Sequence, residues 1–107
     1  MTLEYFENTS LLNNSVAIYS FLEGVVTKED DIYCSLCLDL NVASEGETLE
    51  ESKNNLLEAV RDYIDLAKSN NIHILRQVPI KDNPIYNGEE IIDNFRIETN
   101  VDICEYA

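Results

Sequence analysis

Apolar and polar residues alternate along two stretches in the first third of the chain. Residues 15–23 read SVAIYSFLE, with apolar side chains on both faces of an extended chain, and this pattern predicts a β-strand. Gly24 follows directly and is expected to interrupt the strand. Residues 32–39 alternate in the same way after a charged turn at 28–31. The two stretches therefore predict a β-hairpin.

The pattern changes to steps of three and four residues after Gly46. Residues 42–44 are long enough for a third short strand, and Thr48 followed by Glu51 is a capping box that begins a helix. Apolar residues then recur on one side of a helix of about 20 residues. They are Leu49, Leu56, Leu57, Val60, Tyr63, Ile64 and Ala67. Asn70 and Asn71 are expected to end the helix, because asparagine tolerates the left-handed backbone found there.

The last third of the chain predicts one clear strand. Residues 94–103 alternate between apolar and polar, whereas prolines at 79 and 84 confine any strand at 72–78 to a sheet edge. Residues 81–93 are expected to form an inserted loop. We therefore predict an α+β fold in β-β-β-α-β order, in which one long amphipathic helix packs on one face of an antiparallel sheet. The sheet has three or four strands, or five if 72–78 joins it. Residues 1–107 form a single domain, in which 1–14 are a leader of unknown structure.

Charge narrows the range of possible partners. The 107 residues carry 21 acidic and seven basic side chains, a net charge of -14. Such a surface repels phosphate backbones and anionic lipids, so direct binding to nucleic acid or a membrane surface is not expected. It favours a basic partner protein, although acidity also serves solubility alone. The chain has no apolar run of membrane-spanning length and no basic signal region, and its three cysteines fit a reducing cytoplasm.

Candidate catalytic chemistry is weak. Cys34 and Cys37 have the spacing of zinc and redox motifs, but residues three apart on a strand point to opposite faces, so the thiols should not converge. Cys104 and His73 are isolated in the sequence. The carboxylates are spread evenly and no glycine-rich phosphate loop is present. We therefore expect no metal, no cofactor and no enzymatic activity, and give little weight to a metal-dependent enzyme.

The order strand, strand, bend, capped helix carries a resemblance to a known family. Residues 32–52, IYCSLCLDLNVASEGETLEES, continue through NLLEAV at 55–60 to Tyr63 and Ile64. This string resembles the N-terminal domain of the HicB-like antitoxin family, over about residues 15–70. The resemblance implies a partial ribonuclease-H-like fold without catalytic carboxylates. It also implies a partner, since family members typically block a small basic messenger-RNA interferase of the HicA type.

The resulting hypothesis is a cytoplasmic, non-enzymatic antitoxin-type module that forms a homo-oligomer, a dimer or tetramer, and neutralises a HicA-type toxin. Asp39, Glu45 and Glu47, at the bend and helix start, are the expected contact residues. The alternative is an oligomeric structural domain of the same fold with no toxin partner. A DNA-binding domain is not expected, because residues 72–107 hold three basic and seven acidic residues. The loop at 81–93 is either a contact surface or a tolerated insertion.

Overall fold

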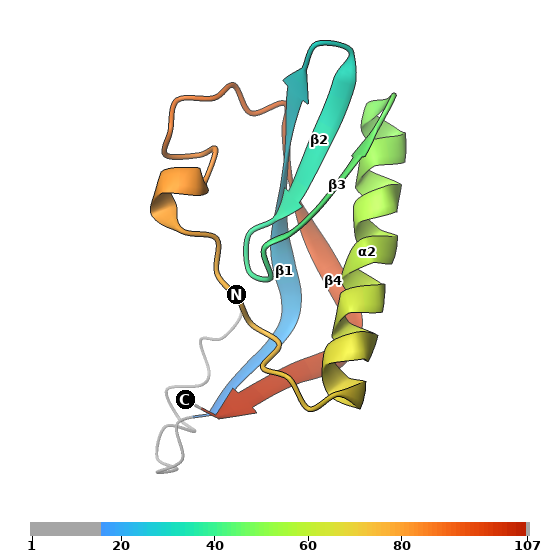
Figure 1. Ribbon diagram of the computed structural model, residues 1–107, viewed down its shortest axis with the longest axis vertical. Coiled ribbons are helices and arrows are strands. Elements are labelled where there is room, and N and C mark those ends of the chain that lie inside the picture. Colours follow the sequence, from blue (N-terminus) through green and yellow to red (C-terminus); the bar gives the residue numbers. More distant parts are fainter. Residues whose placement is uncertain (1–15, 107) are drawn as a thin grey trace.

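One antiparallel sheet and one long helix make up the fold (Figure 1). The computed structural model describes the backbone of residues 16–106 and the side chains of residues 21–98; the leader at 1–14 lies outside them. The elements are β1 (Val16–Glu29), β2 (Ile32–Cys37), β3 (Val42–Gly46), α2 (Leu49–Ser69), a 3-10 turn η1 (Ile80–Asp82) and β4 (Asp93–Tyr106). The strands lie in the order β3-β2-β1-β4, and all neighbours are antiparallel. The predicted α+β fold and β-β-β-α-β order are confirmed.

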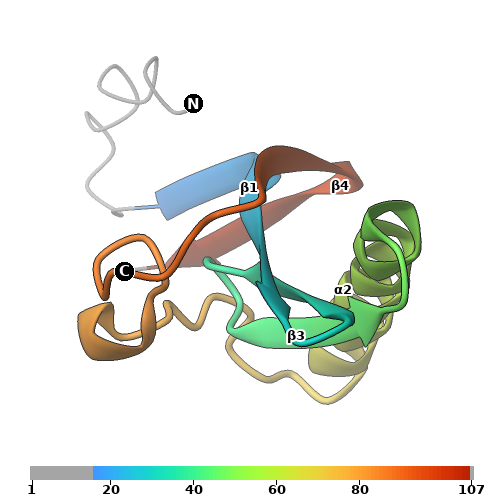
Figure 2. The ribbon, with the colours of Figure 1, turned by 90° about the horizontal axis from the view of Figure 1, so that it is seen from above.

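The sheet lies between α2 and the segment at 78–92, which cover its opposite faces (Figure 2). On the helix side, the buried stripe of α2 (Leu56, Val60 and Ile64) packs with Leu22 of β1 and Ile97 of β4 in the main core. This stripe is the one that the three-and-four spacing predicts. The sheet supplies the other half of the core because its residues alternate between the two faces.

A second, smaller core lies on the other face of the sheet. Val25, Leu38 and Val78 are buried together there, with Leu36 packed against them. Neighbouring residues Val25 and Val26 are 1% and 0% exposed, although adjacent strand residues point to opposite faces. Both are buried because α2 covers one face and the segment that begins at Val78 covers the other.

The expectation that Gly24 interrupts the first strand is wrong. β1 runs through it to Glu29, and Gly24 pairs with Cys37 on one side and Phe95 on the other. A Cβ at Gly24 would lie 2.7 Å from the ring of Phe95. The glycine therefore makes room for an aromatic side chain on the neighbouring strand, which is a known use of glycine inside strands. The turn itself falls at Asp30, where the backbone is left-handed (φ 57°).

Residues 72–78 do not form a fifth strand. The helix ends at the C-cap Asn70, and Asn71 takes the left-handed conformation (φ 57°), as expected for an asparagine there. Two backbone bonds then fix the extended segment, from the Arg76 N–H to the Asp39 carbonyl (2.9 Å) and from the Val78 N–H to the Leu38 carbonyl (3.0 Å). Because these bonds reach a turn rather than a strand, no ladder forms.

Candidate functional site

The structure separates the three expected contact residues into two places. Asp39 lies in the turn between β2 and β3, whereas Glu45 lies near the end of β3 and Glu47 just beyond it. The length of β3, roughly 13 Å at about 3.3 Å per residue, lies between them. Glu45 and Glu47 therefore share the end of the sheet where the β1–β2 turn and the start of α2 meet, and Asp39 does not. We call this the hairpin end.

Asp39 completes the β1–β2 ladder. Regular pairing stops at Gly24 and Cys37, and the next β1 amide, that of Glu23, donates a 2.8 Å hydrogen bond to the Asp39 carboxylate. The backbone carbonyl of Asp39 accepts the Arg76 N–H. Burial raises the pKa of the Asp39 carboxyl; the bond from the Glu23 amide opposes the rise, and the charge of Glu23 adds to it. Asp39 is thus half-buried and bonded within the fold.

The capping box holds the start of α2 against β3. Thr48 Oγ1 accepts the Glu51 N–H (3.0 Å), as predicted, while the Glu51 carboxylate accepts the N–H of Glu47 (2.6 Å), one residue before the cap. Gly46 allows the close approach, because a Cβ there would lie 2.5 Å from the amide nitrogen of Ser52. The side chains of Glu45 and Glu47 remain exposed, so the hairpin end presents them to solvent.

Carboxylates from three different elements influence the thiol of Cys34, on the sheet face opposite α2. Partial burial and then these negative charges raise its pKa. The carboxylates are Glu29 of β1, Glu45 of β3 and Glu89 of the loop before β4. Cys34 and Glu45 are register partners on neighbouring strands. Acidic side chains distant in sequence therefore gather on this face at the hairpin end.

The two cysteines of the CxxC motif lie on opposite faces of the sheet, as predicted. Cys37 is fully buried in the core under α2, and burial raises the pKa of its thiol to about 12. Cys34 is half-buried on the other face. His73 is exposed after α2, and the side chain of Cys104 lies outside the described residues. Among the side chains described, no group of three or more potential ligands could hold a metal ion.

Several basic side chains lie over aromatic rings. Four of the seven lysine and arginine residues do so, with the charged group 4.2–5.2 Å from the ring centre. The pairs are Lys28 with Tyr33, Lys53 with Phe95, Arg76 with Tyr63 and Arg96 with Phe21. Such cation–π contacts stabilise each pair modestly, by about 0.5–1 kcal/mol where exposed. They also place these four positive charges beside aromatic rings of the same chain.

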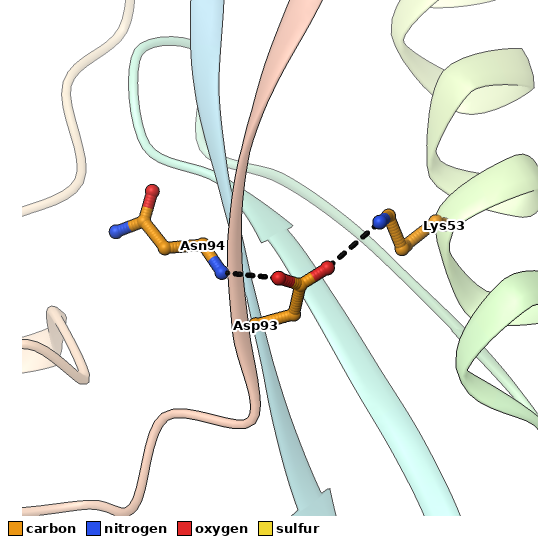
Figure 3. Close-up of polar contacts among 3 residues, drawn as sticks. All are labelled: Lys53, Asp93 and Asn94. Atoms are coloured by element: carbon orange, nitrogen blue, oxygen red, sulfur yellow. Dashed lines mark hydrogen bonds and ion pairs between the residues drawn. The ribbon is translucent and has the colours of Figure 1, made fainter.

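Lys53 also connects α2 to the start of β4 (Figure 3). Its ammonium group lies 2.7 Å from one carboxylate oxygen of Asp93, while the other oxygen accepts the Asn94 N–H at 3.0 Å. The hydrogen bond from Lys53 lowers the pKa of Asp93. This ion pair fixes the point where the inserted loop ends and the last strand begins.

The acidic residues of the bend can be identified from the sequence, but the groups that they contact cannot. Nothing local in the sequence shows that Asp39 bonds to β1, because its partner lies 16 positions away. Glu29 and Glu89 were missed for the same reason, since only the register and the path of the loop bring them near Cys34. The loop also carries exposed apolar residues, Ile80, Ile85 and Tyr86. Their exposure could not be predicted from the sequence, because it depends on the burial of Asn83 and Pro84 between them.

Comparisons with protein-family models, with curated proteins and with solved structures found no match to this chain. Within the described part of the chain, neither α2 nor the 3-10 turn is both long and apolar enough to cross a membrane. The geometry and charge of the chain itself are therefore the basis for assigning it a function.

Proposed function

We propose that the protein is a non-catalytic, HicB-like antitoxin-type module that binds and neutralises a small basic RNA-cleaving toxin of the HicA type. The observation that carries the proposal is the different placement of the basic and acidic side chains. Four of seven basic side chains are directed onto aromatic rings, while carboxylates gather at the hairpin end. The net charge of -14 makes the surface predominantly negative.

Electrostatic complementarity explains how such a module would recognise its target. A protein that cleaves RNA must attract phosphates and is therefore basic at its binding surface. An acidic module competes for that surface, speeds association and repels RNA. The predicted order of strands and helix, on which the resemblance depends, agrees with this proposal. We place the module in the cytoplasm, where Cys34 and Cys37 would remain free thiols.

The test is affinity purification of the tagged full chain from its native cells, with two charge-matched variants as additional baits. Glu45→Lys with Glu47→Lys reverses exposed charges at the hairpin end, and Glu58→Lys with Asp62→Lys reverses exposed charges on α2. Asp39 is left unchanged because it is bonded to β1. We expect one small basic protein in equal amount with the wild type and the α2 variant, and much less with the hairpin-end variant.

The co-purified protein is then tested for RNA cleavage. The proposal predicts cleavage by that protein alone and inhibition by one equivalent of this chain. Equal recovery by all three baits would remove the hairpin end from the contact surface. Recovery of no basic protein would contradict the antitoxin role itself.

A second candidate function is an oligomeric structural domain without a toxin. One feature favours it: β4 spans 14 residues and, among the described strands, pairs only with β1. A long unpaired strand edge can pair with another chain. This candidate predicts that the chain purifies only with itself and sediments as a discrete oligomer.

A further inference from the structure

The segment from Val78 to Asp93, which includes η1 and leads into β4, is held firmly against the sheet at both ends. At its start, Val78 is buried against Val25 and Leu38, and its N–H donates to the Leu38 carbonyl at 3.0 Å. At its end, the Ile92 N–H donates to the Val26 carbonyl at 2.7 Å, and Asp93 pairs with Lys53. The segment therefore has a fixed place on the face opposite α2 (Figure 2).

The middle of this segment presents apolar side chains to solvent. Asn83 and Pro84 are buried, and Asn83 organises the turn because its side-chain oxygen accepts the Ile85 N–H and its carbonyl accepts the Tyr86 N–H, both at 2.9 Å. The turn directs the neighbouring side chains outward. Ile80, Ile85 and Tyr86 are 72%, 41% and 69% exposed. We call these three residues the loop patch.

The composition of the loop patch is that of a binding surface. Single exposed apolar residues are common on proteins, but here three large ones lie within one anchored turn. Tyrosine is enriched at the centres of protein interfaces, where charged residues are depleted. Ile80 and Tyr86 bury little of their surface in the fold, so their apolar character is explained better by a partner than by stability.

Acidic residues flank the loop patch in the sequence. Asp82, Glu89 and Glu90 belong to the same segment, whose one basic residue is Lys81. The negative charge of Glu89, like those of Glu29 and Glu45, helps to raise the pKa of the Cys34 thiol. This part of the loop therefore lies near the hairpin end. An apolar centre with a rim of one charge is complementary to a partner with the opposite charge.

We propose that the loop patch is the contact centre for a basic protein whose own surface carries an exposed aliphatic or aromatic side chain between lysines or arginines. The inference rests on the proposed function for the charge of the partner and adds the place where that partner docks. A second copy of this chain fits less well, because it would bring two acidic rims together, each on a chain with a net charge of -14.

The test uses two labelled synthetic peptides of equal positive charge, one of lysine, glycine and serine and one in which leucine and tryptophan replace the serines. Each is titrated by fluorescence anisotropy into the full chain, into Ile80→Ser with Tyr86→Ser, and into the control Leu66→Ser. Leu66 is 60% exposed on α2 and so matches the patch residues in character. We expect the wild type and control to bind the apolar peptide about tenfold more tightly than the polar one. The patch variant should lose this preference while binding the polar peptide unchanged.

Each other outcome overturns the inference in a distinguishable way. If both peptides bind the wild type equally, the loop patch is not a docking centre, and the acidic module of the proposed function is unaffected. If neither peptide binds, the basic partner itself is contradicted. If the patch variant alone changes the sedimentation of the chain, a second copy covers the patch. Equal thermal midpoints of the three proteins confirm that the substitutions leave the fold intact.

Discussion

Asp39 is expected to contribute to folding through its hydrogen bond and to oppose folding through its charge. Its carboxylate accepts the Glu23 N–H at 2.8 Å where the β1–β2 ladder ends. Replacement by alanine leaves that amide without its partner, and the loss of one such bond costs about 1–2 kcal/mol. Replacement by asparagine keeps an oxygen in place for the amide and removes the charge that burial penalises. We therefore expect Asp39→Ala to lower the free energy of unfolding and Asp39→Asn to preserve or raise it.

The pH dependence follows from the raised pKa of Asp39. An acid with a folded-state pKa above its unfolded value stabilises the fold most when protonated, and this contribution is lost as the pH rises through the folded-state pKa. Asparagine resembles the protonated acid at every pH. The stability advantage of Asp39→Asn over the wild type should therefore be smallest below the ordinary aspartate pKa and should grow as the pH rises.

Urea denaturation at pH 7 and at pH 3, followed by circular dichroism, measures these differences. For a chain of this size, ~1.5 kcal/mol corresponds to a shift of roughly 5–10 °C in Tm, which thermal melting resolves easily. The transition slope should remain that of the wild type, because neither substitution changes the surface exposed on unfolding. If asparagine destabilised the protein as much as alanine does, or if alanine had no effect, the structural role assigned to Asp39 would be wrong.

Four further substitutions test the packing around α2. Gly46→Ala places a Cβ 2.5 Å from the Ser52 amide nitrogen, so thermal melting should show a loss of about 1–3 kcal/mol, and an unchanged Tm would contradict the close approach. Ser52→Ala removes a buried hydroxyl that has no hydrogen-bond partner among the described residues, so urea titrations should show the fold stabilised by up to about 1 kcal/mol. Ser35→Ala instead loses the 3.0 Å hydrogen bond that the Ser35 hydroxyl donates to the Ser52 carbonyl, and it should destabilise the fold by a similar amount. Asp93→Asn breaks the ion pair with Lys53 and should lower the free energy of unfolding by about 0.5–1 kcal/mol at pH 7. Because the pKa of Asp93 is lowered, the difference in stability between wild type and variant should shrink as the pH falls below 4. A difference that stays constant with pH would argue against the ion pair.

Local sequence signals predicted the elements of this fold well. The capping box at Thr48 begins α2 and the asparagines at 70 and 71 end it, because both signals act through neighbouring backbone groups. Opposite faces for Cys34 and Cys37 followed from strand geometry alone. The errors arose where distant residues decide the structure. Gly24 looks like a strand breaker until Phe95 of β4 is placed beside it.

The candidate site depends even more on distant contacts. The sequence alone marks Asp39, Glu45 and Glu47 as acidic neighbours of a bend, but the strand between them separates one from the others. The path of the chain after α2 decides the rest. Val78 packs on Val25 on the sheet face opposite α2. The inserted loop therefore covers the face that the helix leaves open, and its apolar residues point outward. A pattern of single residues contains no information about that path.

The dissociation constant of the co-purified basic protein, measured at two salt concentrations, tests the central claim most directly. Between about 0.1 M and 1 M salt the Debye length falls from about 10 Å to about 3 Å. We expect tight binding at the lower concentration, weakened at least about tenfold at the higher one, with a further loss for the variant that reverses Glu45 and Glu47. Affinity that is insensitive to salt, or a chain that binds only itself, would contradict it.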